Sequence, residues 1–325
     1  MIVSIIIRTL NEAKHLGDLL ATIELQITKA LEIEVVVVDS GSTDGTIEIA
    51  KSHGVRLTSI EKSEFSFGRA LNIGCDYASG DLLVFISGHC IPVDEFWLQN
   101  LCQPLIDRSV VYAYGLQVGD DTNNFSERRI FAKYFPAVSQ VPQAGYFCNN
   151  ANAAIIREVW EQYKFDEEIT GLEDMAMGKT ITEDSMKIGY VAEAAVFHHH
   201  EESWAQISRR FEREALALQK IMPEIQISLM DVFRFILAST VSDWFHAWRN
   251  GSTSTSFLEM FRYRISQYIG SYKGNKMPRR LAALAKERFF YPNAKKETQN
   301  DQWLKSMRRP TPNEGKQPTR QRQEL

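Results

Sequence analysis

The stretch EVVVVDSGSTDGT, residues 34–46, joins a β-branched run to an aspartate and a glycine-rich turn. Four consecutive valines are typical of a strand that is buried on both faces of a parallel sheet. The glycines let a ligand approach the backbone closely. The carboxylate of Asp39, at the end of the run, could accept hydrogen bonds from a ribose hydroxyl or a base N–H, although a simple helix cap with a tight turn would have the same composition.

The segments on either side repeat this pattern. β-Branched or apolar runs at residues 2–7 and 82–86 alternate with helical spacing at residues 11–31, 43–53 and 68–78. Such β-α-β alternation predicts an α/β fold, a mostly parallel sheet with helices on both faces. Ligands of these sheets bind beyond the carboxyl ends of the strands. Residues 8–10, 39–41 and 87–89 are therefore expected around one crevice.

The rest of the chain is less regular. Further strands are expected at residues 110–118, 152–156 and 190–197, with a long polar loop at 119–146 and helices from residue 204 to about 290. The last stretch is rich in Gln, Arg, Pro and Lys and poor in apolar residues, which predicts disorder. We therefore expect three parts: an α/β domain at 1–220, a helical C-terminal extension at 221–292 and a basic disordered tail at 293–325.

Composition narrows the class of protein. A hydrophobic content of 44% excludes a chain that is disordered throughout. The formal net charge of −4 is the sum of an acidic N-terminal part and a basic C-terminal part. Residues 1–223 carry 19 Lys and Arg against 32 Asp and Glu, whereas residues 224–325 carry 18 against 9. The basic part could meet an anionic membrane surface or pack on the acidic body. The four cysteines have no CxxC spacing, so we expect them to be reduced, as in a cytoplasmic protein. No apolar run reaches the roughly 18 residues of a membrane span, so we do not expect a transmembrane protein.

Taken together, the motifs resemble those of the family 2 glycosyltransferases of GT-A fold, over about residues 1–220. The segments that carry the resemblance are SIIIRTLNE (4–12), EVVVVDSGSTDGT (34–46), FSFGRALNIGCDYASGDLLVFISGHCIP (65–92), FCNNANAAIIR (147–157), GLEDMAMGK (171–179) and VFHHHEESW (196–204). Their order and spacing make the resemblance specific. Within the family the sequence is most similar to rhamnosyltransferase-like enzymes of surface-polysaccharide assembly.

The resemblance implies an inverting enzyme that moves a sugar from a UDP- or dTDP-sugar to a hydroxyl of a glycan or lipid-linked acceptor, in cell-envelope or capsular polysaccharide synthesis. Asp174 would be the catalytic base, with Glu173 beside it. The nucleotide-sugar site would comprise Thr9, Asn11, Glu12, Asp39, Ser40, Gly41, Arg69, Asn72, Ser87, Gly88 and His89. The acceptor site would comprise Asn150, His200 and Trp204, and His198 would lie near the diphosphate.

Residues 87–89 depart from the family pattern, which has an acidic DxD motif that holds a divalent metal there. Imidazole suits Mn²⁺ or Zn²⁺ better than Mg²⁺, so His89 and His198 could hold a softer metal, with Mn²⁺ favoured over Mg²⁺. Alternatively, the enzyme is metal-independent and a protonated His89 pairs directly with the diphosphate. In a third interpretation His89 only makes local hydrogen bonds and the site is inactive. Strand alternation predicts His198 and His200 on one side and His199 on the other.

Two other classes of protein stay open at this point. One is a non-catalytic sugar- or nucleotide-binding relative that has lost the metal motif. The other is a sugar nucleotidyltransferase, although residues 8–12 lack the glycines that such an enzyme would need. Aromatic and basic residues at 233–249 and 261–280 also suit contact with the inner face of a membrane, while core packing or a homodimer would explain them equally well. No feature predicts nucleic-acid binding.

Overall fold

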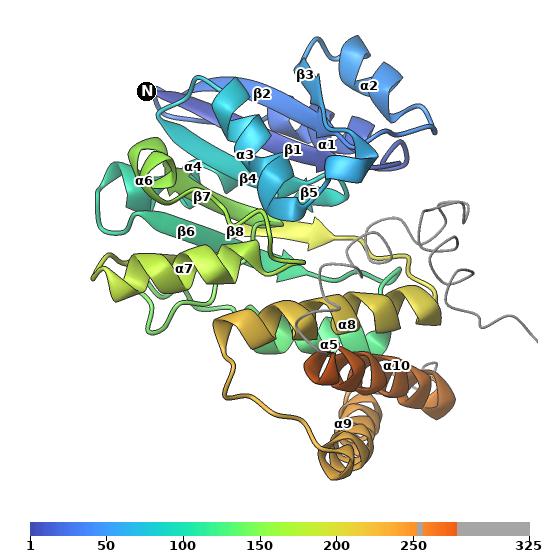
Figure 1. The fold of residues 1–325 in the computed structure, drawn as a ribbon. Helices are drawn as coiled ribbons and strands as arrows, with labels where there is room; N and C mark the ends of the chain where they lie inside the picture. Colours follow the sequence, from blue (N-terminus) through green and yellow to red (C-terminus); the bar gives the residue numbers. More distant parts are fainter. Residues whose placement is uncertain (252–255, 278–325) are drawn as a thin grey trace, which may run out of the picture. The chain divides into compact units, whose positions relative to one another are not determined.

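One eight-stranded sheet organises the computed structural model, which describes residues 1–251 and 256–277 (Figure 1). The strands are β1 (Ile2–Thr9), β2 (Glu32–Asp39), β3 (Arg56–Ser59), β4 (Leu82–Ser87), β5 (Cys90–Pro92), β6 (Tyr112–Val118), β7 (Asn152–Ile156) and β8 (Ile188–His198). Their order is β3-β2-β1-β4-β7-β6-β8-β5. The pairs β3-β2, β2-β1, β1-β4 and β6-β8 are parallel, and β7 and β5 run antiparallel to their neighbours. The predicted mostly parallel sheet is confirmed.

Helices connect and cover these strands. They are α1 (Leu16–Glu24), α2 (Thr46–Ser52), the short 3₁₀ helix η1 (Lys62–Glu64), α3 (Phe67–Tyr77), α4 (Trp97–Ile106), α5 (Phe125–Tyr134), α6 (Arg157–Tyr163), α7 (Glu173–Glu183), α8 (Trp204–Ile221), α9 (Leu229–Arg249) and α10 (Phe257–Lys276). The helix α3 packs on β1 and β2, and α4 packs on β6, β7 and β8. In the described ranges no helix is long and apolar enough to cross a membrane. All four cysteines are buried and free.

Two local predictions were wrong. Residues 119–146 contain the helix α5, which the sequence did not reveal because its buried side includes the polar residues Ser126 and Glu127 beside Phe131. Hydrophobic periodicity is the main signal of a helix, and a polar buried face removes it. The helix expected over residues 11–31 spans only α1, since Asn11 has a left-handed backbone (φ 59°) and belongs to the loop after β1.

The helices α8, α9 and α10 form the predicted C-terminal helical part, and they are grouped on one side of the sheet in Figure 1. The division at residue 220 stays a prediction. Residues 278–292 and the predicted tail at 293–325 lie outside the described residues. The packing of α10 on α8 depends on two glycines, Gly270 and Gly274. A Cβ at Gly274 would overlap the backbone oxygen of Glu212, and one at Gly270 would overlap that of Ser208.

We predict that Gly274→Ala lowers the free energy of unfolding by about 1–3 kcal/mol, because the added methyl meets helix backbone, which cannot rotate away. Urea unfolding at neutral pH measures this. The matched control is Gly17→Ala in α1, where the nearest heavy atom is 3.9 Å from the new Cβ. That variant should be unchanged or up to about 1 kcal/mol more stable, since alanine favours a helix. Equal stability of the two variants would contradict the close packing of α8 and α10.

Candidate active site

A cleft opens at the carboxyl ends of the parallel strands. Thr9, Asp39 and Ser87 end β1, β2 and β4, and parallel pairing brings these three ends to one edge of the sheet. His198 ends β8, which is joined to β4 through the antiparallel β7 and through β6 and therefore runs in the same direction. The cleft has a volume of about 1630 Å³ and is also lined by residues of α5, α8, α9 and α10. Of the residues predicted around the crevice, Ser87 and His89 line this cleft, whereas residues 8–10 and 39–41 do not. A helical wall that the strand pattern did not predict forms much of the cleft.

The loops after β1 and β2 are tied together at one end of this edge. Asp39 is buried, and its carboxylate accepts hydrogen bonds from the Thr9 hydroxyl (3.1 Å) and from the backbone N–H of Gly41 (2.8 Å) and Ser42 (2.9 Å). The backbone of Gly41 is left-handed (φ 89°), which favours glycine. Asn11 joins the loops from the other side, since its amide oxygen accepts from the N–H of Thr43. The structure thus brings together Thr9, Asn11, Asp39, Ser40 and Gly41.

Two predicted nucleotide-binding residues have other partners. The Asn72 amide nitrogen donates to the Phe165 carbonyl and to Glu167, and its oxygen accepts from Trp160 and from the Phe165 N–H. All of its hydrogen-bonding groups are therefore used to hold α3 against the segment before α7. Arg69 forms an ion pair with Glu64 at 3.1 Å. Neither residue lines the cleft, so their nucleotide-binding roles stay predictions that these contacts do not favour.

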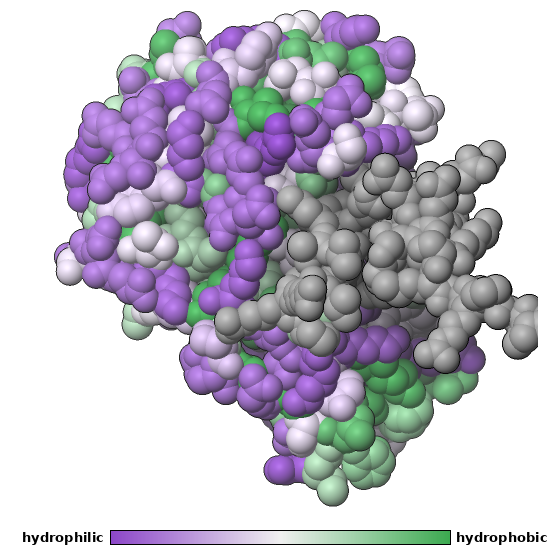
Figure 2. Space-filling view, in the orientation of Figure 1, coloured by the Kyte–Doolittle hydropathy of each residue, from purple (hydrophilic) through white to green (hydrophobic). Residues whose placement is uncertain are grey.

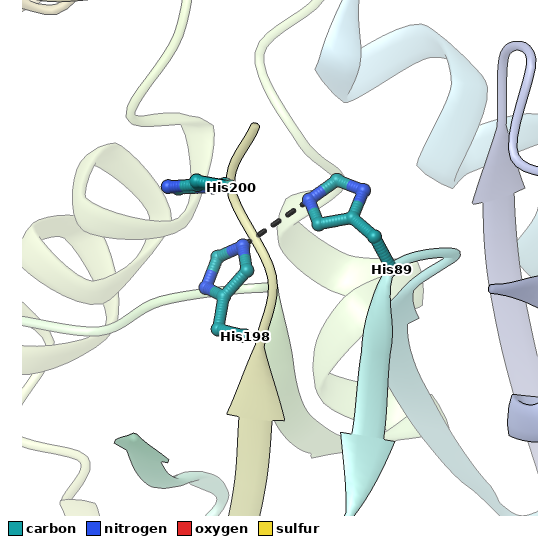
Figure 3. Close-up of side chains that lie close together, drawn as sticks. All are labelled: His89, His198 and His200. Atoms are coloured by element: carbon teal, nitrogen blue, oxygen red, sulfur yellow. Dashed lines mark hydrogen bonds between the residues drawn. The ribbon is translucent and has the colours of Figure 1, made fainter. Parts of the chain in front are cut away.

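Three imidazoles meet in the cleft (Figure 3). His89 lies in the turn between β4 and β5, His198 ends β8, and His200 follows it. One nitrogen from each ring lies within 4.8 Å of the others, and Nε2 of His89 is 3.2 Å from Nε2 of His198. His199 points elsewhere, since it pairs with Asp120 and stacks on His15. The alternation predicted for these histidines is confirmed.

Each of the three rings is oriented by an oxygen on its Nδ1. The partners are Glu12 for His89 (2.7 Å), the Gln117 side-chain oxygen for His198 (2.7 Å) and Glu127 for His200 (2.9 Å). Burial would raise the pKa of Glu127, but His200 and Arg210 lower this pKa to about 2. The carboxylate is therefore ionised at neutral pH and can only accept hydrogen bonds. In a neutral ring that carries its proton on Nδ1, the Nε2 lone pair is free to bind a cation or accept a hydrogen bond.

Burial also keeps His198 neutral. Its pKa is lowered well below the usual value, first by burial and then by the neighbouring His200 and His89. Two Nε2 lone pairs that face each other at 3.2 Å repel unless a cation or a shared proton lies between them. Imidazoles held by carboxylates or carbonyls through the other nitrogen are the usual arrangement of metal-ligating histidines. The residues present therefore fit a divalent transition-metal ion better than Mg²⁺, which prefers oxygen.

Gly88 allows the Glu12–His89 contact to form. A Cβ at residue 88 would lie 2.9 Å from the Glu12 side chain and 3.3 Å from the Arg8 carbonyl oxygen. Any larger residue would push Glu12 away from the imidazole that it orients. The predicted donor residues Glu12, Ser87, Gly88 and His89 are thus one connected unit in the cleft.

The predicted base lies at the start of α7. Asp174 is buried, and its carboxylate accepts from the backbone N–H of Asn150 (2.8 Å) and of Met175 (2.7 Å). Burial, with repulsion from Glu173 next, raises the pKa of Asp174 to about 7. A carboxylate with such a pKa can exchange a proton near neutral pH. Glu173 is held by Arg8 at 3.3 Å, and Leu172 and Met175 on either side of the pair line the cleft.

The predicted acceptor residues separate in the structure. Asn150 lies behind Asp174, where its side-chain oxygen accepts from the Tyr112 hydroxyl and its amide nitrogen is buried without a partner. His200 joins the histidine cluster, and Trp204 is partly exposed at the first position of α8. Their acceptor-binding roles stay predictions.

The sequence analysis missed Gln117 and Glu127, the residues that orient two of the imidazoles. Arg210 forms ion pairs with both Glu127 and Glu202. Three residues further along α8, Arg213 stacks on Phe67, with its guanidinium carbon 4.6 Å from the ring centre. No sequence signal marked Gln117 or Glu127, because they lie 81 and 73 residues from the histidines that they bind.

Comparisons with known proteins agree with this geometry. Residues 4–164 match the profile of the family described as Glycosyl transferase family 2. The chain is 26% identical over 213 residues to the O-antigen chain rhamnosyltransferase RfbN of Salmonella typhimurium, an alignment that covers 62% of this chain and 67% of that protein. It is 28% identical over 192 residues to the O-antigen chain rhamnosyltransferase WbaN of Salmonella anatum, covering 55% and 60%. The chain thus spans about two thirds or less of these relatives.

Among solved structures, the chain is similar to the mannosyltransferase PcManGT from Pyrobaculum calidifontis, in complex with GDP-Man and Mn²⁺. The TM-score is 0.59 at 19% identity, over 90% of this chain and 88% of that one. At this identity the likeness shows a shared fold.

Proposed function

The chain belongs to glycosyl transferase family 2 through residues 4–164, and we propose that it moves a sugar from a nucleotide-diphosphate sugar to a hydroxyl of a glycan or lipid-linked acceptor, with inversion. The relatives named O-antigen chain rhamnosyltransferases support a place in polysaccharide synthesis. The chain's location at the cytoplasmic side of the cell envelope stays part of the proposal. The observation that carries the proposal is the meeting of three oriented imidazoles in the cleft, with a buried carboxylate pair between the cleft-lining residues Leu172 and Met175.

The donor is proposed to lie along the strand ends. Its nucleoside would occupy the Asp39 turn, and its diphosphate would reach the cluster of His89, His198 and His200. A divalent cation bound there, Mn²⁺ in preference to Mg²⁺, would neutralise the charge that develops on the leaving diphosphate. The PcManGT structure, which contains Mn²⁺ and a nucleotide sugar, supports this choice of ion.

Arg213 is proposed to take part in the same charge balance. It lines the cleft, its Nε is buried with no hydrogen-bond partner, and no carboxylate forms an ion pair with it in residues 1–251 and 256–277. Burial lowers the pKa of Arg213, and the nearby carboxylates of Glu214 and Glu202 offset this only in part. A partly buried charge that forms no ion pair is costly, so an anionic group of the donor or acceptor would be a stabilising partner.

The proton transfer is assigned to Asp174. In its ionised form the carboxylate takes the proton of the acceptor hydroxyl as the oxygen attacks the anomeric carbon from the face opposite the diphosphate. The two backbone N–H groups of Asn150 and Met175 hold the carboxylate in one orientation during this step. Glu173 keeps the pKa of Asp174 high, and Arg8 holds Glu173 in place.

Thermal unfolding with UDP, dTDP, GDP and CMP, each with Mn²⁺, Mg²⁺ or EDTA, tests the donor site. A nucleotide at about 100 times its Kd should stabilise the protein by about 2.7 kcal/mol, a shift of several degrees. We expect a shift for UDP or dTDP that is larger with Mn²⁺ than with Mg²⁺ and lost in EDTA. If no nucleotide shifts the transition under any condition, the proposed transfer is wrong. Homodimer formation and contact with a membrane also stay predictions, and both concern the surface of α9 and α10.

A further inference from the structure

The helix α9 presents a polar stripe to the rest of the protein. Asp243 is buried and accepts two hydrogen bonds from Arg264 of α10, at 2.8 and 2.9 Å, and a third from Ser126 of α5 at 2.6 Å. One turn earlier, Ser239 bonds to Tyr268 of α10 at 2.7 Å, and Thr240 is buried beside it. These contacts fix which side of α9 faces inward.

The outward side of α9 is apolar. Its exposed large residues are Leu229, Met230, Phe233, Leu237, Val241, Trp244, Phe245 and Trp248, and Phe257 and Leu258 of the first turn of α10 continue the surface. Trp248 is 67% exposed and Phe233 62%. Figure 2 shows the hydrophobic residues gathered at its lower end, where Figure 1 places α9 and α10. A helix with its polar side buried and its aromatic side exposed is inverted relative to a helix that faces water.

The charges on this surface are mainly positive, and Glu259 in the first turn of α10 is a partly exposed acid. Arg234 and Arg249 are exposed, whereas the two acids of α9 have other roles: Asp231 caps the helix with Ser228, and Asp243 is buried against Arg264. A second copy of the chain on this surface would bring arginine toward arginine. An anionic surface would instead complement both features. Residues 278–325, which follow α10, carry 12 Lys and Arg against 5 Asp and Glu.

We propose that the outward side of α9, with the first turn of α10, docks on an anionic lipid surface. The aromatic side chains would enter the boundary between headgroups and acyl chains, and Arg234 and Arg249 would meet lipid phosphates. Phe235, Ala238 and Ser242 of α9 also line the cleft. If the proposed function holds, docking would therefore bring the cleft beside the membrane, where a lipid-linked acceptor resides. The docking itself does not depend on that function.

Flotation of the full chain with vesicles tests the proposal. We expect binding to vesicles of phosphatidylcholine with phosphatidylglycerol, weaker binding to phosphatidylcholine alone, and a loss of binding as NaCl is raised. The variant with Trp244→Gln, Phe245→Gln and Trp248→Gln should bind the anionic vesicles on the order of 100-fold more weakly, since three large apolar side chains lose their burial. Arg234→Gln with Arg249→Gln should remove most of the preference for anionic lipid.

A matched control places the same change elsewhere. Leu25→Gln with Ile27→Gln alters two residues that are 72% and 54% exposed near the end of α1, and it should bind vesicles as the wild type does. The α9 variant should keep its nucleotide-induced thermal shift, which separates a docking defect from failure of the donor site. Absence of wild-type binding, or undiminished binding by the α9 variant, would overturn the proposal. It would also be overturned if light scattering found a lipid-free dimer that the α9 variant converts to monomer.

Discussion

Asp174→Asn is expected to lower kcat by about three orders of magnitude, within the range of a lost general base, with little change in donor affinity. The asparagine has nearly the same shape and can still accept one of the two backbone hydrogen bonds, but it cannot take a proton from the acceptor. Steady-state transfer kinetics and nucleotide titration measure the two effects separately. If turnover survives within about tenfold of wild type, Asp174 is not the base.

The pH dependence makes this prediction sharper. Because the pKa of Asp174 is raised to about 7, the base is protonated below that value, so kcat/KM should rise as pH increases through about 7. Glu173→Gln removes the neighbouring negative charge and frees Arg8, and both changes lower the pKa of Asp174. The rising limb should therefore move to lower pH.

Glu183→Gln is the control for this shift. Glu183 lies at the far end of the same helix and pairs with Lys179 at 3.9 Å. Glu183→Gln should leave the rising limb of kcat/KM at the same pH as in the wild type. A limb that does not move in Glu173→Gln would mean that Glu173 has no influence on the base, and a limb that moves equally in both variants would point to a general charge effect.

His198→Ala should weaken Mn²⁺-dependent donor binding by about 100-fold or more, since even losing a partner of a metal-ligating histidine costs 10–100-fold. The loss is large because His198 is the buried member of the cluster, and its ring also contacts His89 and His200. Isothermal titration with the stabilising nucleotide, with Mn²⁺ and with EDTA, measures it. His53→Ala is the control, because His53 pairs with Glu24 away from the cleft.

Three results would separate the remaining interpretations of the cluster. His89→Asp replaces a nitrogen ligand with oxygen, so it should raise the affinity for nucleotide with Mg²⁺ relative to Mn²⁺. If instead wild-type binding is unchanged by EDTA and falls as pH rises, a protonated imidazole pairs with the diphosphate directly. If His89→Ala and His198→Ala both bind nucleotide like the wild type, the cluster has no part in donor binding.

Much of the donor end of the site could be predicted because its residues follow strands. Thr9, Asp39 and Ser87 each end a strand, and a run such as EVVVVD shows where a strand ends, whereas His198 was placed near them only through the resemblance. Parallel pairing then brings these ends together without further information. The proposed catalytic pair of Glu173 and Asp174 was found through the resemblance, and the raised pKa of Asp174 arises from a burial that the sequence does not show.

Contacts between distant segments could not be predicted in the same way. The Nε2 atoms of His89 and His198 meet across 109 residues, and their rings are oriented by Glu12 and Gln117 from two other elements. In most helices of soluble proteins the apolar residues mark the side that faces the core. The helix α5 instead buries polar residues, and α9 exposes apolar ones, so neither orientation could be predicted from apolar spacing.

The alternation of apolar runs and helical spacing was thus enough to identify the sheet, its mostly parallel order and the edge where polar residues gather. These properties depend on local periodicity, which each segment carries in its own residues. Whether His89 meets His198, whether Asp174 is buried beside Glu173, and which side of α9 faces outward were decided by tertiary packing. The reason is physical: the free energy of a hydrogen bond, an ion pair or a pKa shift depends on the partners and the burial that distant segments supply, and no local pattern records them.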